Sequence, residues 1–260
     1  MEYFVENFAK FMLVFARITA LSFVATFFSS ETLIPQVRFG LAFLLSIIIF
    51  PVVHDLLPMI PLTFYEYGGL LVGEAIIGIG IGFCIDVAFS VFQLAGQFFT
   101  VQMGFGASEV YDPLSQISIP LIGQYLYFLA LLVFLVTMGP LHIIKAIYHS
   151  FELVNIANFM NGQFLTSEYG LIEIFSNMFV TGLRIAMPMI GALFLVTVAL
   201  GLMGKASPQM NLLMVGFPIS IASSFMLLLV ILPMMVLLFG EYFFEMFRNL
   251  WFLLMAVSNG

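Results

Sequence analysis

The sequence is poor in charged residues and nearly devoid of cysteine. Of its 260 residues, 8% are charged and 63% are hydrophobic, whereas soluble domains carry about 25% charged residues. A soluble domain could not bury so much apolar surface, so the composition excludes a water-soluble protein. Cys84 is the only cysteine and lies within an apolar run, which excludes an intrachain disulfide and disfavours redox chemistry.

Basic residues are scarce as well. Seven Lys and Arg stand against fourteen Asp and Glu, for a formal net charge of −7, and they form no cluster. Neither a nucleic-acid partner nor recognition of anionic lipid is therefore expected. The few basic residues are spread almost evenly over alternate connections, so they do not fix the orientation of the chain in a bilayer.

The sequence motifs of common catalytic and metal centres are also missing. There is no His-Glu-x-x-His, no P-loop and no Gly-x-Ser-x-Gly. We therefore expect no enzymatic activity, no cofactor and no metal site. His142, Lys145 and His149 lie near the end of an apolar run, and with few further ligands nearby we interpret them as anchors at a membrane interface.

Long apolar runs dominate what is present. A helix that crosses the hydrocarbon core needs roughly 20 apolar residues, and by that criterion we count about six runs. The sequence therefore predicts an all-α fold, a polytopic helical membrane protein with about six long hydrophobic helices. The runs lie near residues 8–28, 39–60, 68–98, 120–141, 175–203 and 212–240.

The last two runs are expected to form a helical hairpin. They are joined by a short segment that contains Gly204 and Pro208, residues typical of tight turns. This hairpin is separable in pattern from the first four runs. We therefore divide the chain into a helical portion at 1–174 and a hairpin portion at 175–260.

A polar stripe follows the third apolar run. Gly82, Asp86, Ser90, Gln93 and Gln97 recur every three or four residues and so share one helix face. Ionisable groups at membrane depth normally face partners or water. The stripe therefore predicts a hydrated path or a subunit seam.

The fifth run repeats this pattern with Asn177, Thr181, Arg184 and Pro188. The alternative to a path or seam is pairing inside one bundle, for instance of Asp86 or Glu74 with Arg184. Gly78 and Gly82 have the Gly-xxx-Gly spacing that lets two helix backbones approach closely.

A polar, glycine-broken loop at 102–119 interrupts the hydrophobic runs. It carries large apolar side chains between glycines that could act as hinges. Such a loop favours a plug in a pore over a simple connector, although its apolar side chains could instead tuck into the bundle. The candidate gating residues are Gln102, Met103, Gly104, Phe105, Gly106, Val110, Tyr111, Asp112 and Pro113.

Five segments occur in a characteristic order along the chain. They are Ile34–Arg38, Glu74–Phe83, Gln102–Phe105 with the following Asp112-Pro113, Leu200–Asn211 and Val215–Pro218. This ordered set resembles the FliR family of flagellar export-gate proteins and its virulence-secretion counterpart SctT. Gln102–Phe105 with Asp112-Pro113 matches the family's loop, and Glu74–Phe83 resembles its third helix.

The resemblance implies a fold in which a FliP-like portion (1–174) is followed by a FliQ-like hairpin (175–260). It implies a core subunit of the type III export gate, assembled with FliP-like and FliQ-like subunits. FlhB-like and FlhA-like proteins are the further partners, and unfolded proteins are the substrates. The location implied is the flagellar basal body in the bacterial inner membrane, and the loop 102–113 would close the pore.

Two other functions remain open at this point. A secondary transporter of a small polar solute could use Asp86, Glu74 and Arg184 near the midplane, although no inverted repeat is visible. A scaffold could template ring assembly without touching substrate. A subunit of the virulence-type apparatus is a variant of the gate hypothesis.

Overall fold

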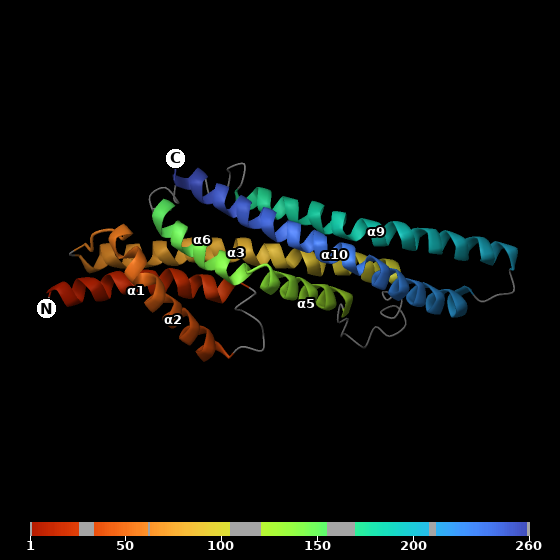
Figure 1. The fold of residues 1–260 in the computed structure, drawn as a ribbon, viewed down its shortest axis with the longest axis horizontal. Coiled ribbons are helices and arrows are strands. Elements are labelled where there is room, and N and C mark those ends of the chain that lie inside the picture. The colour runs from red at the N-terminus through yellow and green to blue at the C-terminus, as the bar shows by residue number, and fades with distance from the viewer. Residues whose placement is uncertain are drawn as a thin grey trace. The chain divides into compact units, whose positions relative to one another are not determined.

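The computed structural model describes residues 2–25, 34–61, 63–104, 121–154, 170–207 and 212–258, and every regular element in them is a helix. The predicted all-α class is thus confirmed (Figure 1). The α-helices are α1 (Glu2–Val24), α2 (Pro35–Val53), α3 (Phe64–Met103), α5 (Leu121–Val136), α6 (Gly139–Leu153), α9 (Leu171–Ala206) and α10 (Leu212–Ser258), with a 3-10 turn at His54–Leu56.

Five of these helices are long and apolar enough to cross a membrane, or six if α5 and α6 together form one broken span. This agrees with the predicted polytopic membrane protein. Three helices exceed what one crossing requires, because α3 has 40 residues, α9 has 36 and α10 has 47. At 1.5 Å per residue, α10 is about 70 Å long, more than twice the hydrocarbon thickness.

The described residues fall into two compact units that interleave along the chain. Unit 1 contains Met1–Ala88, Met138–Ser176 and Phe243–Gly260, and unit 2 contains Phe89–Thr137 and Asn177–Tyr242. Helices α3, α9 and α10 therefore contribute to both units. The division predicted from the sequence has a single boundary after residue 174, whereas each of these units is made of several separate segments.

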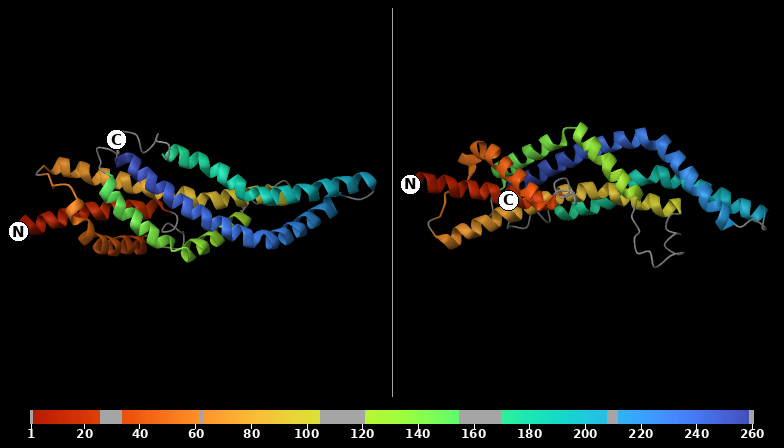
Figure 2. Two further views of the ribbon diagram at one scale, coloured as in Figure 1. Left: turned by 45° about the horizontal axis from the view of Figure 1, so that its top comes forward. Right: turned by 90° about the horizontal axis from the view of Figure 1, so that it is seen from below.

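In unit 2, α9 and α10 run side by side as the arms of a hairpin (Figure 2). Gly182 of α9 packs on α3, where a Cβ would lie 3.1 Å from Leu94 Cδ2. Gly96 of α3 meets the backbone of Gly123 on α5 so closely that a Cβ would overlap with it. Small residues thus set the distance of α9 and α5 from α3.

In unit 1, a stripe of Glu74, Gly78 and Gly82 on α3 packs against α1. The three residues are four apart and share one face of the helix. A Cβ at Gly78 would overlap with the carbonyl oxygen of Arg17, and one at Gly82 would lie 2.9 Å from that of Leu21. The two glycines therefore let α1 approach α3 backbone to backbone, one turn from Glu74.

This close approach buries an ion pair, which we call the Arg17 cluster (Arg17, Glu74, Ser150 and Phe151). Arg17 Nε donates to Glu74 Oε2 at 2.5 Å, and Nη1 donates to Ser150 Oγ at 3.0 Å. The guanidinium carbon lies 4.0 Å from the centre of the Phe151 ring. Arg17 is 1% exposed and Glu74 is 3% exposed. The cluster joins α1, α3 and α6 and leaves the buried charges compensated.

Replacing Arg17 by methionine is expected to destabilise the protein severely. Breaking one side of a buried pair leaves an uncompensated charge and costs about 3–5 kcal/mol. We expect a clearly lower melting temperature of the detergent-solubilised chain. The double variant Arg17→Met/Glu74→Leu should recover part of the loss, since apolar residues can replace a buried pair.

The matched control is Arg248→Met. Arg248 and Glu245 form an exposed pair at 3.9 Å, and such pairs contribute about 0–1 kcal/mol. Equal melting temperatures for Arg17→Met and Arg248→Met would contradict a stabilising role for the Arg17 cluster.

Candidate functional site at the end of helix α3

The polar stripe on α3 changes its surroundings along its length. Gly82 is buried against α1, whereas Asp86, Ser90 and Gln93 are half-buried and Gln97 is exposed. The opposite positions Val87 and Val91 are buried, and Leu94 and Phe98 are half-buried. From Asp86 onward, the stripe therefore lies at the margin of the core and can meet water or another chain.

The second polar stripe lies on the outer side of α9. Asn177 and Arg184 are exposed and Thr181 is half-buried, while the buried positions of this helix are Gly182, Ile185, Ala186, Met189 and Leu193. Among the described residues, neither the α3 stripe from Asp86 onward nor the three polar residues on α9 are fully buried.

The alternative pairing of Glu74 with Arg184 is wrong, because the Glu74 carboxylate is taken by Arg17. Sequence reasoning did not single out Arg17, although a signal was present. A lone arginine inside the first apolar run, at membrane depth, requires a partner.

Helix α3 ends abruptly at Gly104. This residue has a φ of +87°, a conformation that favours glycine, and its N–H donates to the Val101 carbonyl at 3.2 Å. Residues that carry a side chain rarely adopt this φ. Gly104 can adopt it, and it ends the helix at the start of the predicted plug loop. Met103, the residue before it, is fully buried.

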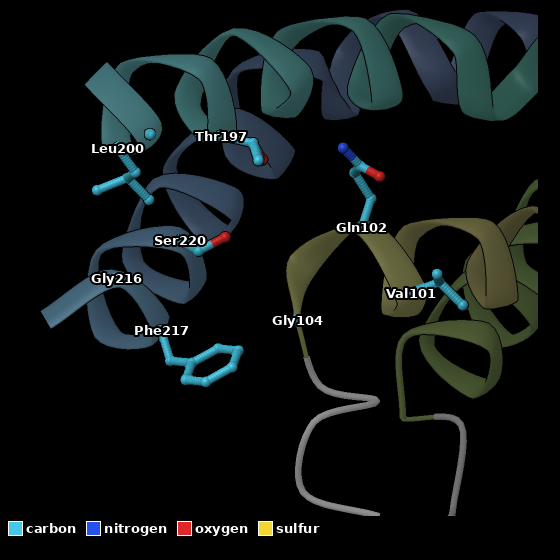
Figure 3. Close-up of a pocket in the computed structure, with 9 residues that line it drawn as sticks. Val101, Gln102, Gly104, Thr197, Leu200, Gly216, Phe217 and Ser220 are labelled. Carbon is cyan, nitrogen blue, oxygen red and sulfur yellow. The ribbon is translucent and has the colours of Figure 1, made fainter. Parts of the chain in front are cut away.

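A pocket of about 440 Å³ opens beside this helix end. Gln102 and Gly104 form one wall, with Thr197 and Leu200 of α9 and Phe217 of α10 opposite. The ring of Phe217 is directed toward Gly104, and the side chain of Gln102 extends from the end of α3 toward α9 (Figure 3). The other lining residues are Val101, Gly201, Gly216 and Ser220.

Three segments that carry the family resemblance thus converge. They are the end of α3 at Gln102, the end of α9 at Leu200-Gly201, and the start of α10 at Gly216-Phe217. The first lies about a hundred residues before the other two in the sequence, yet all three line one cavity within unit 2. The remaining loop candidates, Phe105, Gly106, Val110, Tyr111, Asp112 and Pro113, lie outside the described residues.

Among the described residues, no three His, Cys, Asp or Glu side chains gather as metal ligands. The site consists of a helix that ends at a glycine of positive φ, a pocket lined by polar and apolar residues, and partly exposed polar stripes. These features suit protein–protein contact.

These features define a helical membrane protein with a pocket beside the end of α3. Comparison with known proteins identifies its family. The family model described as bacterial export proteins, family 1, matches residues 8–246. The chain therefore belongs to the FliR family of bacterial export proteins, and it is a membrane protein of flagellar protein export rather than an enzyme.

Its relatives match along nearly their whole length. The chain is 32% identical to flagellar biosynthetic protein FliR of Bacillus subtilis (strain 168) over 258 residues, which cover 96% of this chain and 97% of that protein. It is 28% identical to that of Pectobacterium carotovorum (96% and 95% covered) and 29% identical to that of Escherichia coli K12 (90% and 88% covered).

Replacing Gly104 by alanine should impair flagellar export. An alanine would have to hold a positive φ, at a cost of roughly 1–2 kcal/mol, and its Cβ would lie 3.1 Å from Phe217 Cδ1. We expect less swimming in soft agar when the variant replaces the native gene, at an unchanged amount of the chain in membranes.

Gly201→Ala is the control for this experiment. Gly201 lines the same pocket but lies within α9, and a Cβ there meets nothing within 4 Å. It should swim normally. Equal swimming of the two variants would show that the turn at Gly104 has no role in export.

Proposed function

We propose that this chain is a core subunit of the flagellar type III export gate. In this proposal it forms, with FliP-like and FliQ-like subunits, a protein-conducting pore for unfolded proteins. It lies in the flagellar basal body of the inner membrane, beside FlhB-like and FlhA-like proteins. The observation that carries the proposal is the convergence of the three family-like segments around the exit of the loop at Gly104.

The loop that begins at Gln102 is the proposed plug. A plug loop needs a fixed point of attachment, which we call its root, and free space beside that point into which the loop can move. Gly104 supplies the fixed change of direction, and the 440 Å³ pocket lies directly beside the root. Phe105, Gly106, Val110, Tyr111, Asp112 and Pro113 would form the movable part. Met103 would serve as the root, because its side chain is fully buried.

The polar stripes are the proposed seams with partner subunits or with the pore. Asp86, Ser90, Gln93 and Gln97 on α3 and Asn177, Thr181 and Arg184 on α9 are half-buried or exposed. Polar groups in such apolar helices require polar neighbours. Only 22% of the most apolar stretch of α9 and 17% of that of α10 is buried inside the chain, so lipid or other subunits must cover the remainder.

The alternatives are less well supported. The family relatives are flagellar, which favours the flagellar over the virulence-type apparatus. A secondary transporter would lose Glu74 as a substrate or proton site, since that carboxylate is paired with Arg17 in the core.

Deleting Gly104–Tyr111 should make the assembled complex leaky. Without a plug, membranes that contain the complex should pass small solutes or ions, measured as dye or ion efflux from loaded vesicles. The Gly201→Ala complex should stay tight. A deletion complex of normal composition that does not leak would refute the plug.

Asp86→Ala should weaken assembly with the partner subunits. If the stripe forms a seam, the variant should lower the yield of the complex with FliP-like and FliQ-like proteins in native mass spectrometry. Glu66→Ala is the control, because Glu66 is an exposed acid in the first turn of the same helix. Equal yields for both variants would count against the seam.

A further inference from the structure

A second pocket lies between α6 and the end of α10, within unit 1. Its α6 wall carries His142, Lys145 and His149, which share one face of the helix because they are spaced by three and four residues. The chain has only three histidines and seven Lys and Arg. Two of the histidines and one lysine therefore gather here, in a protein of net charge −7.

The α10 wall is aromatic. The rings of His142 and Phe247 have centroids 4.9 Å apart, and those of His149 and Trp251 are 4.4 Å apart and nearly perpendicular. The cavity measures about 170 Å³. This is below the roughly 300–1,000 Å³ of pockets for drug-sized ligands, and the space suits one small polar group.

The charges around the pocket leave a cation at its rim. His149 Nδ1 lies 3.0 Å from Glu152 Oε2, so that carboxylate has a polar contact on its own helix. Arg248 lies 3.9 Å from Glu245 and pairs with it. Lys145 is exposed, and none of the described residues forms an ion pair with it. An anion is therefore the ligand that this rim favours, whereas Lys145 would repel a metal cation.

Exposed apolar side chains flank the pocket on both helices. Leu141 and Ile144 on α6 are 46% and 37% exposed, and Phe244 on α10 is 68% exposed. A ligand with an anionic head and apolar tails satisfies the pocket and its flanks together. Basic pockets between membrane helices bind phospholipid headgroups, and tryptophan favours the same interface.

We propose that this pocket binds the phosphate of an acidic phospholipid, such as phosphatidylglycerol. Lys145 and His142 hold the phosphate, and Trp251 and Phe247 line the space for the glycerol. The acyl chains lie along Leu141, Ile144 and Phe244. The bound lipid fastens α6 and the end of α10 at the membrane interface, independently of any gating role of the loop.

Trp251 offers a direct test, because it is the only tryptophan of the chain and lines the pocket. The full chain is placed in nanodiscs that contain either brominated phosphatidylglycerol or brominated phosphatidylcholine at equal mole fraction. Bromine quenches nearby tryptophan. We expect stronger quenching by phosphatidylglycerol in the wild type and about a fivefold weaker preference in Lys145→Gln.

Lys205→Gln is the matched control, since Lys205 is a basic residue in the last turn of α9, outside this pocket. It should keep the wild-type preference. His142→Gln provides a second variant should Lys145→Gln fail to fold. Equal quenching by the two lipids in the wild type, or an equal loss in Lys145→Gln and Lys205→Gln, would overturn the proposal.

Two competition arms identify the source of the anion. Inorganic phosphate in the buffer should leave the lipid preference intact. If it abolishes the preference at millimolar concentration, the pocket is a site for soluble phosphate and the lipid assignment is wrong. Displacement of the lipid by an acidic peptide of equal charge would overturn it in favour of a protein partner.

Discussion

A buried arginine–glutamate pair sets the geometry of unit 1. Arg17 reaches Glu74 because Gly78 and Gly82 bring α1 against the backbone of α3, and it reaches Ser150 and Phe151 of α6 from the same position. The two buried charges cannot move far apart, because a buried charge without its partner lowers the stability of the fold. Ser150 and Phe151 belong to the buried face of α6. Anchoring that face to Arg17 leaves the basic face, with His142, Lys145 and His149, to meet α10.

The sequence was sufficient to predict helices and their apolar character, because composition and run length depend only on local residues. It could not predict the partner of Arg17. Glu74 lies 57 positions away and Ser150 lies 133, and no periodic pattern links residues at such distances. Counting charges at membrane depth indicates that a partner must exist. It does not select among the available ones, which is why pairing Glu74 with Arg184 was a reasonable alternative and still wrong.

The end of α3 illustrates a second limit. The glycines at 104 and 106 indicated a break, and Gly104 does end the helix. Met103 was assigned to the loop by its position beside that break, yet it is fully buried in the same row as Ala95 and Phe99. These residues recur every four positions, so the periodicity of the core face already extended to Met103. The convergence with Leu200 and Phe217 was outside the reach of sequence reasoning, because only packing within unit 2 brings those segments together.

The long helices differ in how much of their apolar surface is buried within the chain. The most apolar stretch of α3 is 67% buried within the chain, while those of α9 and α10 are buried by only 22% and 17%. The hairpin thus presents apolar surface to lipid or to other subunits, and its polar stripe on α9 is the seam that we propose for those contacts. A chain whose basic residues do not fix its orientation needs other anchors. The proposed polar seam and the proposed lipid pocket on α6 would supply such anchors. Each would fix the chain at particular residues, whereas an excess of basic residues acts on a whole loop.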